Sequence, residues 1–400
     1  MAKINLRDLN ITGKRVLVRV DFNVPLDGNH QVSDDTRILA AIPTIDFLIS
    51  HGAIVVLMSH LGRPKGQRIT EMSLAPVSRR LAELLGKPVF MATDCIGEEV
   101  SSQVRKLEPG QIMLLENLRY HKEEESNDEE FSRALADLGE IYVNDAFGAA
   151  HRAHASTEGV THYLSPSLSG FLMEAEITYL QEALRHPDRP FVAILGGAKI
   201  SGKIEVIDNL LDKVDTLIIG GGMSYTFFKS MGLEIGDSLL EEDRVDVARK
   251  VIGRCQEQGV DLLLPRDIIV ADGFSDSAQT RVVSRESMPI GWEGMDIGPE
   301  TCKLYSQRLS KAGTVIWNGP VGVFEIPAFA HGTRAVAEAL VLATKQGTTS
   351  IIGGGDTAAA IGQMNYGDAM THISTGGGAS LECMGGRTLP GVEALTDKEV

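Results

Sequence analysis

Four arginines in the first half of the chain lie where an open parallel sheet would hold an anion. Arg63, Arg119 and Arg152 each follow a short apolar run of strand length, and Arg37 begins the amphipathic stretch after the first such run. Ligands of open α/β sheets bind beyond the carboxyl ends of the strands, so we expect the four guanidinium groups to converge. A guanidinium binds carboxylate and phosphate oxygens in a bidentate manner. The pattern predicts a pocket for a small polyanion, although each arginine alone is more typical of a surface ion pair.

The corresponding junctions in the second half of the chain are rich in glycine. They begin at Gly196, Gly220, Asn318, Gly353 and Gly376. Glycine at a strand-to-helix junction lets backbone N–H groups approach a phosphate and leaves the helix N-terminus free to face it. One such turn can be only a tight connection, but its repetition along the chain favours a nucleotide-like ligand.

Two of these junctions can be compared with other phosphate-binding motifs, the P-loop and the dinucleotide-binding motif. The segment 197–203 fits the GxxxxGK pattern, but Ile204 stands where a P-loop needs Ser or Thr to hold Mg²⁺. The segment 353–355 does not fit GxGxxG, and Thr375 stands about 20 residues further on, where a dinucleotide site needs an acid. Asp356, at the expected start of a helix, either carries Mg²⁺ or only caps the helix.

The sequence shows no recognisable nucleophile or metal-ligand motif. The ten histidines form no ligand pattern with Cys or acidic residues, no cysteine has a suggestive histidine companion, and no GxSxG elbow occurs. A polyanion pocket and a nucleotide-like pocket without a nucleophile predict direct phosphoryl transfer between two bound substrates, achieved by positioning and charge stabilisation.

Repeated strand-length runs, each followed by an amphipathic stretch, predict the sheets that position these residues. Eleven such runs are too many for one ordinary parallel sheet, so we expect an α/β fold with two doubly wound, Rossmann-like sheets. The expected strands cover 15–20, 53–58, 88–91, 112–115, 141–143, 191–195, 216–219, 261–264, 314–317, 350–352 and 370–373.

Two other segments have a predicted role. The Ser-rich stretch 164–172 is the expected connector between the sheets, and it leads into a helical pattern over 171–184. The acidic run 122–130 is expected to be a solvated helix start, because Ser126 and Glu129 have capping-box spacing and Phe131 follows at helical period.

Length and composition narrow the classes of protein. The 400 residues support two domains, and 54 acidic against 38 basic side chains give a net charge of −16, which argues against general nucleic-acid binding. No apolar run approaches the roughly 18 residues of a membrane span, and the start lacks the apolar region of a signal peptide. The four cysteines form no CxxC pair. We expect a soluble, cytoplasmic protein.

Several strings resemble phosphoglycerate kinases, in the family's order and across essentially the whole chain. They are VDFNVP at 20–25, SHLGRP at 59–64, GAAHRAH at 148–154, GGAK at 196–199, WNGPVGVFE at 317–325 and GGGDT at 353–357. The resemblance implies an enzyme that transfers phosphate from 1,3-bisphosphoglycerate to ADP, giving 3-phosphoglycerate and ATP, with Mg²⁺ and hinge closure. It also implies a monomer with a triose-phosphate domain at 1–170, a nucleotide domain at 171–388 that begins with a hinge helix at 171–190, and a tail at 389–400 that returns to the first domain.

The same resemblance implies roles for individual residues. The triose-phosphate site would comprise Asp21, Asn23, Arg37, His60, Arg63, Arg119 and Arg152. The nucleotide site would comprise Lys203, Gly220, Gly221, Asn318, Glu325, Gly353, Gly354, Gly355, Asp356 and Thr357, with Glu325 on the ribose, Gly220 and Gly221 against adenine, and Asp356 on the metal. Arg37 and Lys199 would contact the phosphoryl group in transit, aided by backbone N–H groups of Gly376 and Gly377.

Two other functional classes stay open at this point. A non-enzymatic scaffold would most simply have lost Arg37, Lys199 or Asp356, and all three are present. A nicotinamide-dependent oxidoreductase on a similar fold is disfavoured by the absent GxGxxG motif.

Overall fold

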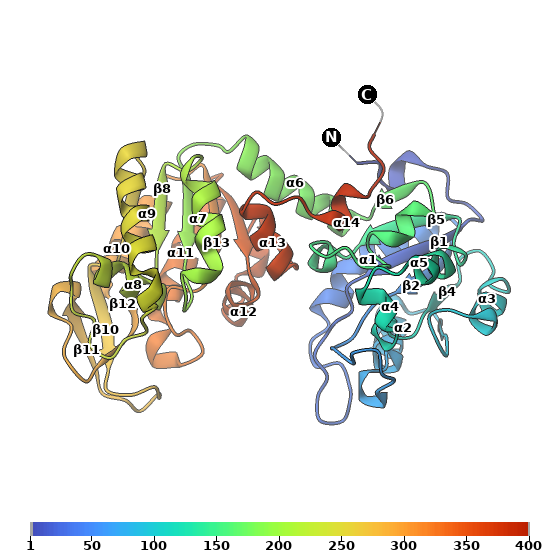
Figure 1. Ribbon diagram of the computed structural model, residues 1–400, viewed down its shortest axis with the longest axis horizontal. Helices are drawn as coiled ribbons and strands as arrows, with labels where there is room; N and C mark the ends of the chain where they lie inside the picture. The colour runs from blue at the N-terminus through green and yellow to red at the C-terminus, as the bar shows by residue number, and fades with distance from the viewer. Residues whose placement is uncertain (1–2, 399–400) are drawn as a thin grey trace. The chain divides into compact units, whose positions relative to one another are not determined.

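The computed structural model describes residues 3–398 and divides them into two compact units (Figure 1). Unit 1 contains residues 3–178 and 388–398, and unit 2 contains residues 179–387. Helix α6 (Phe171–Arg185) crosses the division along the chain. Among residues 3–398, no helix combines the length and the apolar character that crossing a bilayer requires.

Unit 1 is built on a six-stranded parallel sheet in the order β3-β4-β2-β1-β5-β6. Its strands are β1 (Arg15–Val20), β2 (Ile54–Met58), β3 (Val89–Met91), β4 (Ile112–Leu114), β5 (Ile141–Asp145) and β6 (Ser167–Ser169). The main helices are α1 (Thr36–Ser50), α2 (Ala75–Leu85), α3 (Glu98–Val104), α4 (Lys122–Glu125) and α5 (Glu129–Ala136). Strand β1 lies between β2 and β5, so the chain order reverses there and the carboxyl ends of these three parallel strands lie at one edge of the sheet.

Unit 2 contains a second six-stranded parallel sheet, in the order β15-β14-β13-β7-β8-β9. Its strands are β7 (Phe191–Leu195), β8 (Thr216–Ile219), β9 (Asp261–Leu263), β13 (Thr314–Asn318), β14 (Thr349–Gly353) and β15 (His372–Ile373). The helices used below are α7 (Ile204–Leu211), α8 (Met223–Ser230), α9 (Val245–Gln258), α10 (Pro299–Leu309), α11 (His331–Lys345), α12 (Gly355–Gln363) and α13 (Gly377–Met384). The two parallel sheets confirm the predicted fold class.

Both parallel sheets have cores made of the predicted apolar runs. Strands β2 and β7 are buried along their whole length, because helices cover both faces of a doubly wound sheet. Trp317 on β13 is the largest completely buried side chain, and its indole N–H donates to the carbonyl of Gly319 at 2.7 Å. That bond fixes the turn that leaves β13.

The sequence reading missed four strands. Strand β6 lies inside the expected Ser-rich connector and pairs with β5, where Leu168 is its only apolar residue. A separate antiparallel sheet, β11-β10-β12, comprises β10 (Asp267–Ala271), β11 (Thr280–Ser284) and β12 (Glu293–Ile297). Strand β11 is largely exposed and therefore lacks the apolar run on which the prediction depended.

The prediction for the acidic run 122–130 was also wrong in two respects. Asp128, not Ser126, caps α5, and its carboxylate accepts the Phe131 N–H at 2.9 Å. Glu124 is completely buried instead of solvated.

The C-terminal segment packs on unit 1. Helix α14 (Pro390–Glu393) is held by Asn144, whose amide donates to the Gly391 carbonyl at 3.1 Å, and by the Gly391 N–H, which donates to Ala150. The Lys3 ammonium lies 3.0 Å from the Asp397 carboxylate. Residues 399 and 400 of the expected tail lie outside the described residues.

Candidate functional site

The first group of predicted site residues lies around the end of β1 in unit 1. Arg37 is the second residue of α1, and its guanidinium lies 3.3 Å from the Asp21 carboxylate and donates to the Asn23 carbonyl at 3.0 Å. The Asn23 side-chain oxygen in turn accepts the Gly62 N–H at 2.8 Å. Arg37 does not pair with Asp35, which instead binds Arg80 at 2.7 Å. These bonds join the loop after β1, the start of α1 and the loop after β2.

His60 is a buried member of the same group, and its imidazole is neutral. Burial, followed by the positive charges of Arg19, Arg119 and Arg37, holds the pKa of His60 well below its usual range. The Arg19 guanidinium lies 3.0 Å from Nδ1 of His60, and arginine can only donate, so Nδ1 accepts and Nε2 carries the proton. His60 therefore offers an N–H donor to an anion.

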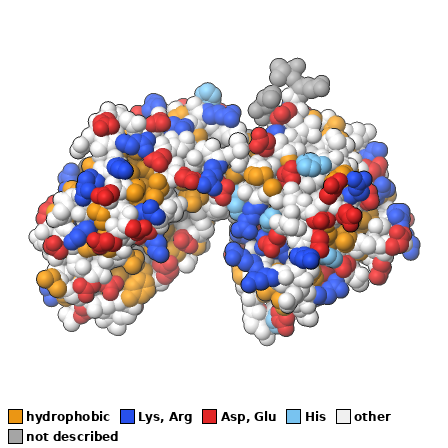
Figure 2. All heavy atoms as spheres, viewed as in Figure 1, with side chains coloured by type: hydrophobic (Ala, Val, Ile, Leu, Met, Phe, Trp, Pro, Cys, Tyr) orange, Lys and Arg blue, Asp and Glu red, His pale blue; other side chains and the backbone are white. Residues whose placement is uncertain are grey.

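The remaining arginines differ in burial. Arg119 is buried and donates to the Gly62 carbonyl at 2.9 Å, and burial lowers the pKa of its guanidinium, with Arg19 and Arg152 as positive neighbours. Arg152 and Arg63 are exposed, and among residues 3–398 no ion pair holds either guanidinium. Figure 2 shows Lys, Arg and His side chains gathered on unit 1. The group is positive and open to solvent, as an anion site requires.

Sequence reasoning missed the buried residues beneath this group. The Arg19 guanidinium donates to the Ser156 hydroxyl at 2.8 Å, and that hydroxyl donates to the Glu124 carboxylate at 2.5 Å. Burial also lowers the pKa of His154 to about 4, with Arg119 as the largest charge contribution. Arg19 lies within a strand and Glu124 within an acidic run, so neither gave a signal that could separate it from the structural background.

The glycine junctions of unit 2 pack against one another through their backbones. The Gly196 N–H donates to the Asn318 carbonyl at 2.9 Å, and the Gly221 N–H donates to the Val321 carbonyl at 2.9 Å. At Gly221, φ is +66° and a Cβ would lie 2.7 Å from the Gly197 nitrogen. A Cβ at neighbouring Gly220 would lie 2.6 Å from the Val321 side chain. These positions require glycine because three strand-end loops approach here at backbone distance.

Lys203 and Asn318 form the polar centre of unit 2. The Lys203 ammonium donates to the Asn318 carbonyl at 3.1 Å and to its side-chain oxygen. Burial lowers the pKa of Lys203 to about 8, and the Asp356 carboxylate partly opposes that shift. Next to this pair, the Thr357 hydroxyl accepts the Gly319 N–H at 2.7 Å.

Two helices begin beside this centre. Gly354 precedes α12 with φ of +89°, and a Cβ on Gly377, the first residue of α13, would lie 3.2 Å from the Gly355 nitrogen. A Cβ on Gly353 would lie 3.4 Å from the Asn318 amide. Gly376 is the residue before α13, and its N–H donates to the Ser374 hydroxyl at 3.2 Å. The adjacent helix N-termini make this region favourable for negative charge.

A cavity of about 350 Å³ lies beside these loops and is lined by Gly221, Glu325 and Asp356. Its apolar wall includes Leu239 and Phe274, which are 59% and 65% exposed. The volume falls in the range of ligand pockets, which is roughly 300–1,000 Å³. Sequence reasoning did not identify Leu239 or Phe274, because single apolar residues in loops carry no periodic signal.

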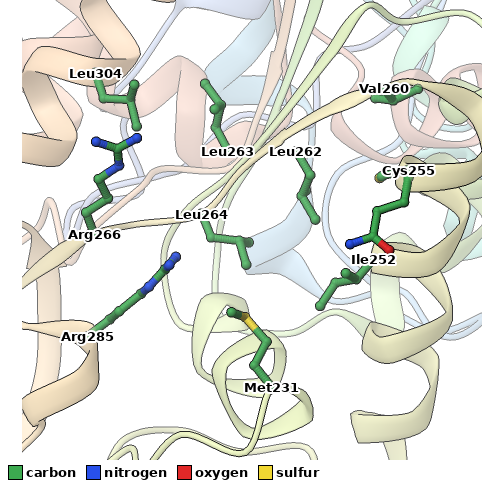
Figure 3. Close-up of a pocket in the computed structure, with 11 residues that line it drawn as sticks. Met231, Ile252, Cys255, Val260, Leu262, Leu263, Leu264, Arg266, Arg285 and Leu304 are labelled. Carbon is green, nitrogen blue, oxygen red and sulfur yellow. The ribbon is translucent and has the colours of Figure 1, made fainter.

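A second cavity of about 350 Å³ in unit 2 contains none of the predicted site residues. Figure 3 shows Arg266 and Arg285 on one side of it and Ile252 and Cys255 on the other. Its walls are mainly apolar, and Arg285 is already paired with Glu286 at 2.9 Å. We therefore place the candidate site at the first cavity.

The donor set near that cavity fits a divalent metal at Asp356. Asp356 is an exposed residue in the first turn of α12, and Gly354, not Asp356, precedes the helix. Helix α12 begins without a side-chain cap bond, so Asp356 does not cap it. Carboxylate oxygens are the hard ligands that Mg²⁺ prefers. Lys199 is exposed. Burial raises the pKa of the nearby Glu241 carboxyl, but hydrogen bonds from Ser201 and Ile200, with a smaller contribution from the Lys199 charge, hold it below its usual value.

The fold and these sites define a class, that of two-unit α/β phosphotransferases acting on small molecules. Comparison with known proteins identifies the family. The family model described as phosphoglycerate kinase matches residues 6–387, and the chain belongs to this family.

Individual relatives show how far the likeness extends. The chain is 56% identical to phosphoglycerate kinase of Chloroherpeton thalassium over 398 residues, covering 99% of this chain and 100% of the relative. It is also 56% identical to that of Synechococcus elongatus, covering 99% and 98%. The solved structure of phosphoglycerate kinase from Coxiella burnetii is 42% identical with a TM-score of 0.89, and that from Pyrococcus horikoshii is 32% identical with a TM-score of 0.84. Both structures match 98% of each chain.

Proposed function

We propose that this chain catalyses the reversible, Mg²⁺-dependent transfer of a phosphoryl group from 1,3-bisphosphoglycerate to ADP, giving 3-phosphoglycerate and ATP. The observation that carries the proposal is that the two units bring different groups of residues together. Unit 1 holds a positive group of residues, and unit 2 holds a cavity with an apolar wall beside two helix N-termini. Family membership supplies the reaction.

In unit 1, we assign the triose phosphate to Asp21, Asn23, His60, Arg63, Arg119 and Arg152. The neutral His60 would donate from Nε2, and the exposed Arg63 would move onto phosphate or carboxylate oxygens. Arg152, which donates to Nε2 of His151 at 3.1 Å, would exchange that bond for one to the ligand. Arg119 is already held by Gly62, so it forms a fixed wall of the site. A fixed donor beside mobile ones lets the ligand complete the pocket.

In unit 2, we assign the nucleotide to the cavity near Gly221. Leu239 and Phe274 offer apolar contacts to the base, Gly220 and Gly221 let it approach the backbone, and Glu325 accepts from the ribose hydroxyls. Lys203, Asn318 and Thr357 with the loop 353–355 would then face the phosphates, whose negative charge would stabilise the Lys203 ammonium against the effect of burial. Asp356 would hold Mg²⁺, which neutralises charge on the phosphate oxygens when bound.

The reaction requires charge stabilisation and no general base. In the direction that consumes ATP, the acceptor is a carboxylate that is already ionised at neutral pH. Charge on the phosphoryl group in transit would be met by Arg37 from unit 1 and Lys199 from unit 2. The N–H group of Gly377 would aid them, as would that of Gly376 once it leaves the Ser374 hydroxyl.

Because Arg37 and Lys199 belong to different units, we propose that the units close on their ligands and exclude water. Small-angle scattering should show compaction only when 3-phosphoglycerate and Mg·ATP are both present. An unchanged radius of gyration with both ligands at saturation would contradict closure. We further propose that the active protein is a monomer, and light scattering of the active protein tests this.

The decisive experiment is a coupled assay with 3-phosphoglycerate and Mg·ATP, in which a dehydrogenase consumes the acyl phosphate and oxidises NADH. The purified chain alone should not oxidise NADH, which separates the proposal from a nicotinamide-dependent oxidoreductase. A folded protein that supports no turnover would favour a non-enzymatic scaffold and overturn the proposal.

A further inference from the structure

We propose that unit 1 carries a binding site for a borderline-soft divalent cation such as Zn²⁺, formed by Asp94, Cys95 and His121. One ligand atom from each of these residues lies within 4.8 Å of the other two. The site is separate from the predicted Mg²⁺ position at Asp356, which lies in unit 2.

The sheet creates this juxtaposition. Strands β3 and β4 are parallel neighbours, so the chain leaves both at the same edge. Asp94 and Cys95 follow β3, while His121 follows β4 and the 3₁₀ turn Leu118–Tyr120. The Glu116 N–H donates to the Asp94 carbonyl at 3.3 Å and joins the two exits. Asp94 and His121 are 27 positions apart, too far for a local ligand motif to show in the sequence.

The three candidate ligands differ in donor atom and in exposure to solvent. Nε2 of His121 lies 2.7 Å from an Asp94 carboxylate oxygen, and the two side chains are 27% and 36% exposed. The Cys95 side chain is completely buried beneath them. A cation can therefore enter from solvent between the imidazole and the carboxylate, bind the sulfur below, and keep water as a fourth ligand.

The donor types set the class of cation. Sulfur and imidazole nitrogen favour Zn²⁺, Co²⁺ or Cd²⁺ over Mg²⁺, which prefers oxygen ligands. In the metal-free protein, the carboxylate can only accept, so Nε2 of His121 donates to it. Burial raises the pKa of the Cys95 thiol well above its usual value, with the charges of Asp94 and Glu124 adding to the effect. Binding through Nε2 would leave the imidazole proton on Nδ1, and binding at Cys95 would release the thiol proton to solvent.

The neighbouring Arg68 does not prevent a cation from reaching Asp94. The Arg68 guanidinium lies 3.8 Å from the second Asp94 oxygen, but its side chain is 56% exposed and can move away. A bound cation would link the β3 exit to the segment that carries Arg119, two residues before His121. It would thus hold together two segments that the metal-free protein joins through one hydrogen bond between side chains and one between backbones.

Cobalt titration tests the site in the full-length, reduced protein after chelator treatment. Adding Co²⁺ in the presence of excess Mg²⁺ should produce a sulfur-to-cobalt charge-transfer band in the near ultraviolet, and Zn²⁺ should abolish it. Cys95→Ser should lose this band. The matched control Cys302→Ser, with the thiol removed from α10, should keep it.

A second variant keeps the test valid if the buried serine disturbs folding. His121→Gln changes a partly exposed side chain and retains the buried thiol. It should weaken Co²⁺ binding by more than about tenfold, since even loss of a supporting contact to a ligand costs about 10- to 100-fold. Zn²⁺ should raise Tm of the natural protein and leave Tm of His121→Gln unchanged. Absence of the band in the natural protein, or a band that persists in Cys95→Ser, would overturn the proposal.

Discussion

Arg37 allows binding and catalysis to be separated by one substitution, Arg37→Met. Its guanidinium makes one ion pair, at 3.3 Å from Asp21, and one hydrogen bond, at 3.0 Å to the Asn23 carbonyl. The Arg37 side chain is 37% exposed, so water screens the pair, whose loss should lower the free energy of unfolding by at most about 1 kcal/mol. That is small against the roughly 5–15 kcal/mol that stabilises a folded domain.

The expected effect on rate is much larger. If Arg37 leaves Asp21 and meets the phosphoryl group only in transit, the substitution removes one transition-state donor, which typically lowers kcat by about 10²- to 10³-fold, or about 2.7–4 kcal/mol. KM should change little, because an interaction made mainly in the transition state does not contribute to ground-state binding. The coupled assay gives kcat and KM, and a thermal melt gives the change in stability.

Arg63→Met is the matched control. Arg63 is exposed and has no ion pair among residues 3–398, so its loss should leave Tm unchanged and act mainly on KM for 3-phosphoglycerate. A near-normal kcat in Arg37→Met would remove Arg37 from the mechanism. Equal KM effects in both variants would mean that the arginines do not divide their roles as argued.

Three further predictions concern unit 2. Glu325→Gln should raise KM for ADP more than it lowers kcat, because a ribose contact persists through the cycle; unchanged ADP kinetics would make Glu325 only a cavity-wall carboxylate. KM for ADP should rise as pH passes about 8, because the buried Lys203 loses its charge there, and Lys203→Met should raise KM at neutral pH and flatten the profile; an unaltered profile in the variant would exclude Lys203. Asp296, which accepts the Gly332 N–H at 2.6 Å, has its pKa raised by burial from 3.8 to about 7. The folded state therefore binds more protons than the unfolded state between those values, so stability should fall as pH rises from about 4 to about 7, and denaturant titrations of Asp296→Asn should lack this decline.

The parallel sheets could be predicted because their strands are buried on both faces. Such strands appear as continuous apolar runs, as in β2 and β7, and the expected ranges differ from the observed bounds by at most a few residues. The small antiparallel sheet could not be found in this way. Its strand β11 is exposed along most of its length, and what defines it is pairing with β10, a non-local property.

Some residues of the candidate site could likewise be predicted from the sequence, and others could not. Residues at the carboxyl ends of buried strands, such as Asp21 and His60, could be found because the fold class places them at one edge. Leu239 and Phe274 could not, because the wall they form depends on loops whose paths are set by tertiary packing. The Asp94 and His121 pair belongs to this second kind, since only the adjacency of β3 and β4 brings the two side chains together.

Glu124 shows why an acidic run can conceal a buried carboxylate. By composition it is one of several carboxylates that a solvated helix start would expose, yet it is completely buried and accepts from the Ser156 hydroxyl and N–H. Burial raises the pKa of Glu124, and the nearby Arg19 charge opposes that shift. Arg19 in turn sets the protonated nitrogen of His60. The tautomer of His60, which we propose as a donor to the triose phosphate, is therefore fixed by buried contacts that begin at Glu124, a residue that its charge alone would assign to the surface.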